Sequence, residues 1–268
     1  MLFVLFGEDN EVLHCYAQLQ SGPLHSRLHR KREIPNWVEW EHIVQDAGST
    51  DETLAVLKEY PHLKWFSEKD RGMSDGINKG FIKATGDLVM WLNSDDYLLP
   101  DALQKVAAFA ADHPDANVIY GATHFVDERR TLIRPKCEHQ FDFNVLLFYG
   151  CYIQSTATFI RRQVIEAGHL LNIEYRVCMD FEYYVRLARR GFRFQYLPQP
   201  LAAFRWHATN TSAVQFQRRR QERLLVQREQ LRQTGRTALQ AAWVLRLLFR
   251  IYQAKHIFLR WRCHGVFR

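Results

Sequence analysis

Short apolar runs alternate with amphipathic stretches between residues 40 and 127, and this alternation is the main structural signal in the sequence. Each apolar run ends in a polar turn, which is typical of a buried strand. The predicted strands are Trp40–Gly48, His62–Asp70, Asp87–Asp96 and Asn117–Asp127. The predicted helices between them are Gly48–Tyr60, Ser74–Gly86 and Leu98–Pro114. Strands that alternate with helices indicate βαβ units and an α/β fold with a mixed, mostly parallel sheet.

Local signals set the expected ends of these helices. Ser49 precedes Glu52 by three residues, the spacing of a capping box at a helix N-terminus. Gly86 is expected to be the glycine that follows the second helix. In the third helix Pro100 lies near the first turn and Pro114 follows the last.

The strand Asp87–Asp96 is apolar on both faces and ends in two adjacent acids, Asp95 and Asp96. Adjacent carboxylates repel each other and are costly to bury, so a divalent cation with oxygen ligands is the simplest partner. Ligands of such sheets bind beyond the carboxyl ends of the strands. The turns Asp46–Asp51 and Asn93–Asp96 are both expected at that edge. Alternatively, each turn simply ends a strand and caps the next helix.

Beyond Phe141 the pattern is less regular and richer in aromatic residues. We predict a helix over Asp180–Arg190, stopped by Gly191, and a strand over Phe192–Leu197. A turn bounded by prolines and a last strand ending at His207 would follow.

Several of these segments together resemble the inverting, metal-dependent family 2 glycosyltransferases. They read IVQDAGSTDETLAVLKEY, SEKDRGMSDGINKGFIKATGDLVMWLNSDDYLLPDAL, VIYGATHFVD and MDFEYYVRLARRG, followed by FRWH. The resemblance extends over roughly residues 37–210. It implies a GT-A fold that binds a nucleotide-diphosphosugar, and transfer of the sugar with inversion at the anomeric carbon.

The resemblance also implies roles for individual residues. Asp46 would contact the base and ribose of the donor. Asn93, Asp95 and Asp96 would form a variant D-x-D motif, in which Asp95 holds Mn²⁺ or Mg²⁺ against the diphosphate. Asp180 would be the base that takes a proton from the acceptor hydroxyl.

Other residues are assigned less directly. His207 matches a position that contacts the metal or diphosphate in some relatives, although its spacing fits a surface histidine equally well. Asp70 and Asp75 are expected to line the donor site, and Gln154 the acceptor side. Asp180 could instead be only the N-cap of its helix, with Glu182 as the base.

The amino-terminal region departs from the family pattern. Relatives begin with a strand that ends in a Thr-Pro turn beside the nucleotide. Here either Val4–Phe6 forms that strand, or the chain lacks it and exposes a sheet edge.

Charge is distributed unevenly along the chain. Residues 215–268 contain 13 Lys and Arg and 2 acids, whereas the whole chain has a net charge of +7. We therefore divide the chain into a GT-A domain, residues 1–214, with an atypical segment 1–36, and a basic tail, residues 215–268.

On a helical wheel an apolar face of the tail lies opposite Arg246, Arg250, Gln253 and Arg260. This pattern favours an anionic membrane surface, with a helix packed on the domain as the alternative. Charge alone would permit nucleic acid, but no recognition motif supports it.

Cysteine usage and the first residues indicate the cellular setting. The five cysteines are scattered and form no C-x-x-C pair, so we expect neither disulfides nor a zinc site. The start MLFVLFGEDN lacks the basic region of a signal peptide, and we expect a cytoplasmic protein, peripheral on the inner face of the cytoplasmic membrane.

These observations predict an enzyme that transfers a sugar from a nucleotide donor, expected to be a UDP-sugar, to a glycan or lipid-linked acceptor in surface polysaccharide biosynthesis. A nucleotidyltransferase is one alternative, but the Gly-rich phosphate loop that it needs is absent near the first strand. An inactive sugar- or partner-binding relative is the other.

Overall fold

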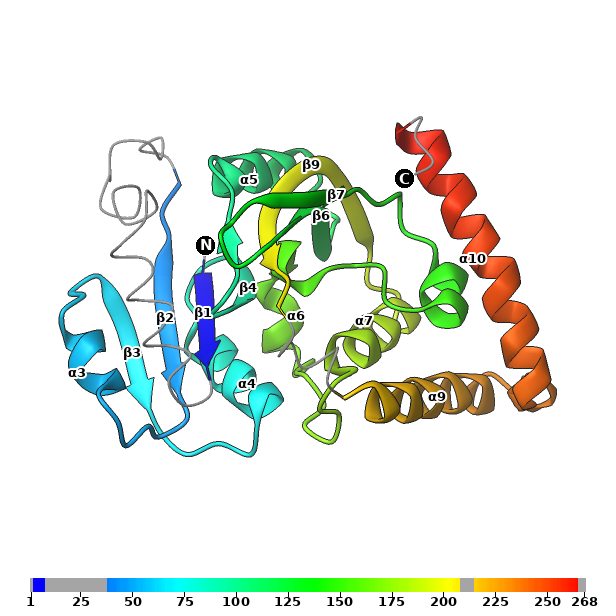
Figure 1. Ribbon diagram of the computed structural model, residues 1–268, viewed down its shortest axis with the longest axis horizontal. Helices are drawn as coiled ribbons and strands as arrows, with labels where there is room; N and C mark the ends of the chain where they lie inside the picture. Colours follow the sequence, from blue (N-terminus) through cyan, green and yellow to red (C-terminus); the bar gives the residue numbers. More distant parts are fainter. Residues whose placement is uncertain (1, 8–37, 208–214, 265–268) are drawn as a thin grey trace.

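A computed structural model describes residues 2–7, 38–207 and 215–264 of the chain. It is a mixed α/β fold in which one central sheet is flanked by helices (Figure 1). In spatial order the strands are β3 (Leu63–Ser67), β2 (Glu41–Asp46), β1 (Leu2–Gly7), β4 (Leu88–Asn93), β8 (Thr158–Arg161), β6 (Val118–Val126), β9 (Phe194–Arg205) and β5 (Tyr97–Leu98), with β7 (Leu132–Lys136) paired to β6.

The first four strands of this order are parallel, and they set the edge at which the polar turns lie. β1 pairs in parallel with both β2 and β4, opposing Gly7 to Asp46 and Phe6 to Asn93. The amino-terminal strand is therefore present inside the sheet rather than missing. Because adjacent strands are about 4.8 Å apart, the ends of β2 and β4 lie about 10 Å apart on either side of β1. Both predicted polar turns thus lie at one edge, as expected.

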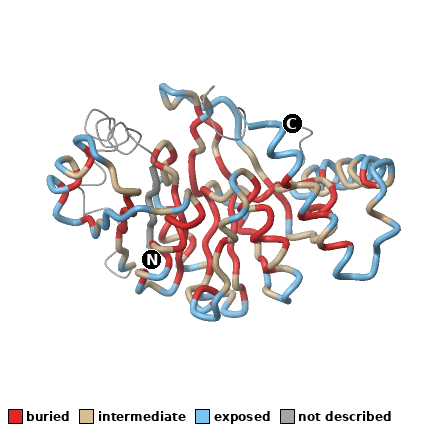
Figure 2. Tube along the Cα trace, turned by 90° about the horizontal axis from the view of Figure 1, so that it is seen from below, coloured by how far each residue is buried: buried red, intermediate tan, exposed pale blue. Residues whose placement is uncertain are grey.

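The helices cover both faces of the sheet, and Figure 2 shows the buried residues concentrated in the middle of the molecule. They are α3 (Thr53–Lys58), α4 (Met73–Lys83), α5 (Ala102–Asp112), α6 (Arg162–Glu166), α7 (Met179–Arg189), α9 (Phe216–Gln233) and α10 (Ala242–His264). Three shorter helices are η1 (Val145–Tyr149), a π-helix, and η2 (Ser155–Ala157) and η3 (Thr237–Gln240), which are 3-10 helices.

Alternate residues of β4 show that the sheet is buried from both sides. Val89 and Trp91 belong to one hydrophobic cluster, together with side chains of α4, α7 and η1. Met90 and Leu92 belong to a second cluster, with side chains of α3 and α5. The two-faced apolar pattern of this strand was therefore interpreted correctly.

Four local predictions are wrong. The third predicted helix includes neither Leu98 nor Pro100, because Leu98 belongs to β5 and α5 begins only at Ala102. Ser49 does not cap α3, because its hydroxyl donates to Asp46, and the helix begins only at Thr53. α4 ends at Lys83, three residues before Gly86, since Ala84 already has extended backbone. The two strands predicted after Gly191 are one strand, β9, which continues past its prolines with shifts of register against β6. Pairing along the length of β6 overrides the turn signal of the prolines.

The tail packs against the domain through one face of α10. Tyr252 stacks on Phe148 with ring centroids 5.2 Å apart, and Nζ of Lys255 lies 2.5 Å from Oδ2 of Asp142. Leu245 is buried in the hydrophobic cluster that includes Val89 and Trp91 of β4. In the described part of the chain, no helix is long and apolar enough to cross a membrane.

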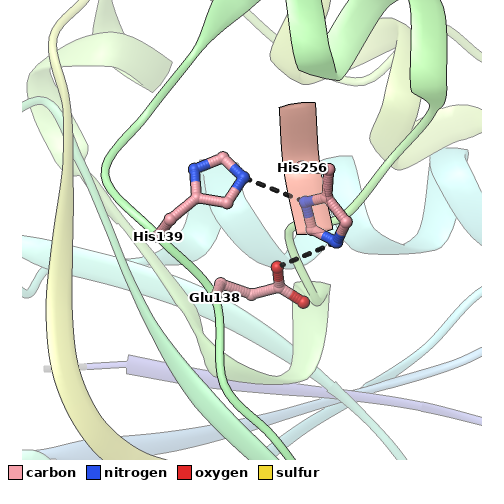
Figure 3. Close-up of side chains that lie close together, drawn as sticks. All are labelled: Glu138, His139 and His256. Atoms are coloured by element: carbon pink, nitrogen blue, oxygen red, sulfur yellow. Dashed lines mark hydrogen bonds and ion pairs between the residues drawn. The ribbon is translucent and has the colours of Figure 1, made fainter. Parts of the chain in front are cut away.

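A buried polar group also joins α10 to the domain (Figure 3). Nδ1 of His256 on α10 lies 2.9 Å from Nε2 of His139, and Nε2 of His256 lies 3.8 Å from a carboxylate oxygen of Glu138. All three side chains are buried. They are of the types that bind metals, and one ligand atom of each lies within 4.8 Å of the other two. The contacts of His256 with His139 and Glu138 also fix α10 on the domain.

Candidate active site

Asp95 and His207 form the exposed part of the site at the end of β4. Nε2 of His207 lies 2.7 Å from Oδ2 of Asp95, and the His207 and Asp95 side chains are 16% and 27% exposed, respectively. β9 carries the chain back to this edge and ends at Arg205, two residues before His207. The structure thus brings together the two residues that were predicted to bind the metal. Their metal-binding role itself stays a prediction.

Asp96 points inward from the same turn and is buried. Its Oδ2 accepts hydrogen bonds from Asn93 Nδ2 at 3.0 Å and Thr156 Oγ1 at 2.9 Å. Its Oδ1 accepts one from the Arg205 amide at 2.9 Å. Burial and the neighbouring Asp95 carboxylate raise the pKa of Asp96. These contacts give Asp96 a structural role, joining three segments, and its predicted contact with the donor is untested.

The carboxylate oxygens of Asp95 suit Mn²⁺ or Mg²⁺, whereas the imidazole nitrogen of His207 favours Mn²⁺ over the harder Mg²⁺. Such ions are commonly held by one or two carboxylates, with phosphate oxygens and water completing the shell. Asp95 is accessible and its carboxylate faces the imidazole, whereas the oxygens of Asp96 already accept three hydrogen bonds. The residues present therefore fit a cation held mainly by Asp95 and shared with a diphosphate.

Asp46 shapes the neighbouring turn at the end of β2. Its Oδ2 accepts from the amides of Gly48 and Ser49, both at 3.0 Å, and from Ser67 Oγ at 2.6 Å. Burial would raise the pKa of Asp46, but the Ser49 and Ser67 hydroxyls and these amides bring it below its usual value. Asp46 is thus an ionised, buried carboxylate that organises the loop, and its predicted contact with the base is untested.

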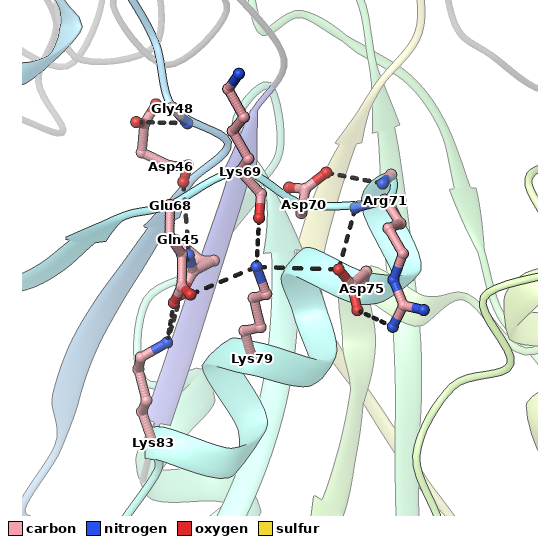
Figure 4. Close-up of polar contacts among 11 residues, drawn as sticks. Gln45, Asp46, Gly48, Glu68, Lys69, Asp70, Arg71, Asp75, Lys79 and Lys83 are labelled. Carbon is pink, nitrogen blue, oxygen red and sulfur yellow. Dashed lines mark hydrogen bonds and ion pairs between the residues drawn. The ribbon is translucent and has the colours of Figure 1, made fainter.

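The loop between β3 and α4 is held by a second polar network (Figure 4). Asp75 accepts from the Arg71 amide at 3.0 Å and from the Arg71 guanidinium at 3.2 Å. Lys79 donates to the Lys69 carbonyl at 2.6 Å. Asp75 therefore fixes the loop, and its role in donor binding stays a prediction.

Asp70 differs from these carboxylates. Its Oδ1 accepts from the Gly72 amide at 2.7 Å, while its Oδ2 is buried without a hydrogen-bond partner among the described residues. A buried oxygen with no donor is costly, and a ligand or water that donates to it would remove that cost. Of the acids in this loop, Asp70 is therefore the better candidate for a donor contact.

Asp180 lies in the first turn of α7 and contacts Cys151, which belongs to the same segment as Thr156, the residue that donates to Asp96. The Cys151 thiol lies 3.8 Å from Asp180 Oδ2, and the Phe181 amide donates to Oδ1 at 2.7 Å. Burial raises the pKa of Asp180, and the Phe181 amide opposes that rise. Thr156, whose hydroxyl donates to Asp96, is the fifth residue after Cys151, so the Cα atoms of Cys151 and Thr156 are at most about 18 Å apart.

The alternative base and the predicted acceptor residue differ in their surroundings. Glu182 accepts from Arg186 Nε at 2.6 Å and Nη2 at 3.1 Å, so its charge is already paired. Gln154 precedes η2 and is partly exposed, and its side-chain amide forms no hydrogen bond to a described residue. The geometry favours Asp180 over Glu182 as a base, and leaves Gln154 available for an acceptor.

Two residues that connect the site were not assigned a role from the sequence. Thr156 supplies a hydroxyl to Asp96, and Cys151 supplies the thiol beside Asp180. Both lie in the segment CYIQSTATFIRR, which also contains Gln154, the residue predicted to reach the acceptor side. The sequence therefore indicated that this segment belongs to the site. It did not indicate that Thr156 contacts Asp96 or that Cys151 contacts Asp180, because those contacts depend on the fold.

Comparisons with known proteins agree with this arrangement. A family model described as glycosyl transferase family 2 matches residues 22–168. A PGL/p-HBAD biosynthesis glycosyltransferase of Mycobacterium bovis (strain BCG / Pasteur 1173P2) is 33% identical over 154 residues, which are 55% of this chain and 58% of that protein. The chain therefore matches less than two thirds of the length of this curated relative.

Two solved structures share the fold. Staphylococcus aureus TarS 1–349 in complex with UDP gives a TM-score of 0.63 at 18% identity and covers 99% of this chain and 74% of that chain. The mannosyltransferase PcManGT of Pyrobaculum calidifontis, in complex with GDP-Man and Mn²⁺, gives a TM-score of 0.57 at 17% identity. It covers 99% of this chain and 75% of that chain. These similarities establish the GT-A-like fold.

Proposed function

Because the chain belongs to glycosyl transferase family 2, we propose that it is an inverting transferase that moves a sugar from a UDP-sugar to a glycan or lipid-linked acceptor in surface polysaccharide biosynthesis. The observation that carries the proposal is the Asp95–His207 pair at the carboxyl edge of the sheet. The strand β1, in place between β2 and β4, supports an active rather than an inactive relative.

In this proposal Asp95 and His207 would hold a divalent cation beside the donor diphosphate. When bound, this cation would stabilise the negative charge that develops on the departing nucleoside diphosphate. Asp96 keeps Asp95 in position, because its own oxygens are bound to Asn93, Thr156 and the Arg205 amide.

Asp180 is proposed to accept the proton of the acceptor hydroxyl while that oxygen bonds to the anomeric carbon. The glycosidic bond to the diphosphate breaks at the opposite face, which inverts the configuration. Because the proton moves as the new bond forms, the position of the carboxylate matters more than its basicity. Asp70 is proposed to contact the donor and Gln154 the acceptor.

We propose a UDP-sugar as the donor because the TarS complex contains UDP. The PcManGT complex contains GDP-Man instead, so the nucleotide must be identified by experiment. The experiment is a panel of UDP-, GDP- and dTDP-sugars, each measured for protection against thermal unfolding with and without Mn²⁺. Metal-dependent protection by a UDP-sugar is the expected result. Protection by no nucleotide sugar would contradict the proposal, and protection only by a GDP-sugar would correct the donor.

A further inference from the structure

A groove lined by arginines lies between α9 and α10. Its volume is about 680 Å³, and its lining includes six arginines and no acid. The six are Arg219, Arg220, Arg223, Arg228, Arg246 and Arg250. None of these six arginines forms an ion pair with a carboxylate of the described residues. The two acids of α9 pair instead with Arg218 and Arg232. The groove therefore offers several positive charges to an anion.

Arg223 shows that this charge is not compensated within the domain. Its guanidinium donates to the Phe148 carbonyl at 2.8 Å and lies 5.1 Å from the centre of the Phe249 ring. Burial lowers the pKa of Arg223. A partly buried cation without a carboxylate is stabilised by an external anion, and guanidinium groups match phosphate oxygens well.

The outer face of α10 carries an exposed apolar ridge beside the groove. Its residues are Trp243, Leu247, Ile251, Phe258 and Trp261, whose exposed fractions range from 41% to 70%. They recur at spacings of four, four, seven and three residues, which places them on one side of a helix. The opposite side, with Leu245, Tyr252 and His256, packs on the domain. Leu247 also lines the groove, so the ridge and the arginines are continuous.

The helical wheel predicted a single apolar face for the tail helix. In the structure, part of that face packs on the domain and part is exposed. Leu248 and Tyr252 pack on the domain, whereas Leu247 and Ile251 are exposed. One side of α10 is thus a helix face packed on the domain, which was the alternative prediction, and the other side remains open.

We propose that this surface docks the protein on an anionic phospholipid bilayer, with the ridge among the acyl chains and the groove arginines on lipid phosphates. A helix with tryptophans at both ends, an apolar face and flanking arginines suits the interface of such a bilayer. A second copy of this chain would bring a like charge to the groove, and nucleic acid would leave the apolar ridge exposed. The proposal does not depend on the proposed transferase activity.

The test is sedimentation of the full chain with vesicles, without donor or metal. Vesicles contain phosphatidylcholine alone or about 30% phosphatidylglycerol, at low and high salt. We expect binding to the anionic vesicles only, weakened by salt. The variants Leu247→Glu/Ile251→Glu and Arg246→Gln/Arg250→Gln should each reduce binding at least about tenfold.

Matched controls use exposed residues outside this surface. Ile82→Glu changes an apolar side chain on α4 that is 66% exposed, and Arg129→Gln/Arg190→Gln removes two exposed charges elsewhere. Both should bind like the unchanged protein. Equal binding to the two vesicle types, or full binding by the ridge and groove variants, would overturn the proposal. Self-association that is lost in Leu247→Glu/Ile251→Glu, with no vesicle binding, would overturn it in favour of a second copy.

Discussion

Nε2 of His207 lies 2.7 Å from Oδ2 of Asp95, although 112 residues separate them in the chain. The contact exists because β4 and β9 end at the same edge of the sheet. β9 reaches that edge by continuing to Arg205, and the Arg205 amide then binds Asp96 at 2.9 Å. One turn thus presents Asp95 outward and anchors itself through Asp96.

Asp95→Asn should abolish metal-dependent protection by the nucleotide sugar, because an amide is a far weaker ligand than a carboxylate. Donor turnover should fall on the order of 10²–10³-fold. His207→Gln should show a smaller loss in the same direction. Thermal shift with and without Mn²⁺, together with initial rates, measures both effects. The control is Asp112→Asn, the same change at an exposed acid on α5. Unchanged metal dependence in Asp95→Asn would contradict the assignment.

Asp180→Asn should remove transfer but keep donor binding. Loss of a general base typically costs about 10²–10⁴-fold in rate, whereas the donor is expected to contact Asp95 rather than Asp180. Transfer rates and thermal protection by donor and Mn²⁺ are the two readouts. Glu182→Gln serves as the comparison, because Glu182 is paired with Arg186. A larger rate loss in Glu182→Gln than in Asp180→Asn would exchange their roles.

The order of strands and helices between residues 40 and 127 followed from the hydrophobic pattern, except for the two-residue strand β5, and so did the shared edge of the two polar turns. Periodicity reports which faces are buried, and parallel strands must end at the same edge. Pairing of Asp95 with His207 was suggested only through the family resemblance, since no local pattern encodes a contact across 112 residues.

The inward position of Asp96 could not be predicted, because Asp95 and Asp96 are chemically identical in the sequence. The donors that distinguish them come from Thr156 and Arg205, on distant segments. The same limit applies to the tail, where the wheel identified apolar residues but not which of them the domain covers.

Asp96→Ala should destabilise the fold. It leaves the Thr156 hydroxyl, the Asn93 amide group and the Arg205 amide without their acceptor in a buried site. The expected loss in the free energy of unfolding is about 2–4 kcal/mol. Denaturant unfolding measures it. Asp95→Ala, beside it but partly exposed, should change stability by less than about 1 kcal/mol. Equal effects of the two substitutions would show that Asp96 does not anchor the turn.

Acid should weaken the fold partly through His256. Burial, together with the nearby charges of His139, Arg260 and Lys136, lowers the pKa of His256 to about 3. The unfolded chain therefore binds a proton below about pH 6.5 that the folded chain excludes, so stability rises with pH between about 3 and 6.5. Lowering the pH from about 7 to about 5.5 should cost about 1 kcal/mol through this group.

His42, whose pKa burial also lowers to about 3, should add a similar loss over the same pH range. Denaturant unfolding at the two pH values should show a shallower dependence in His256→Gln, with the His42 contribution retained. An unchanged pH dependence in that variant would mean that the histidine on α10 is not held neutral by its contacts with His139 and Glu138.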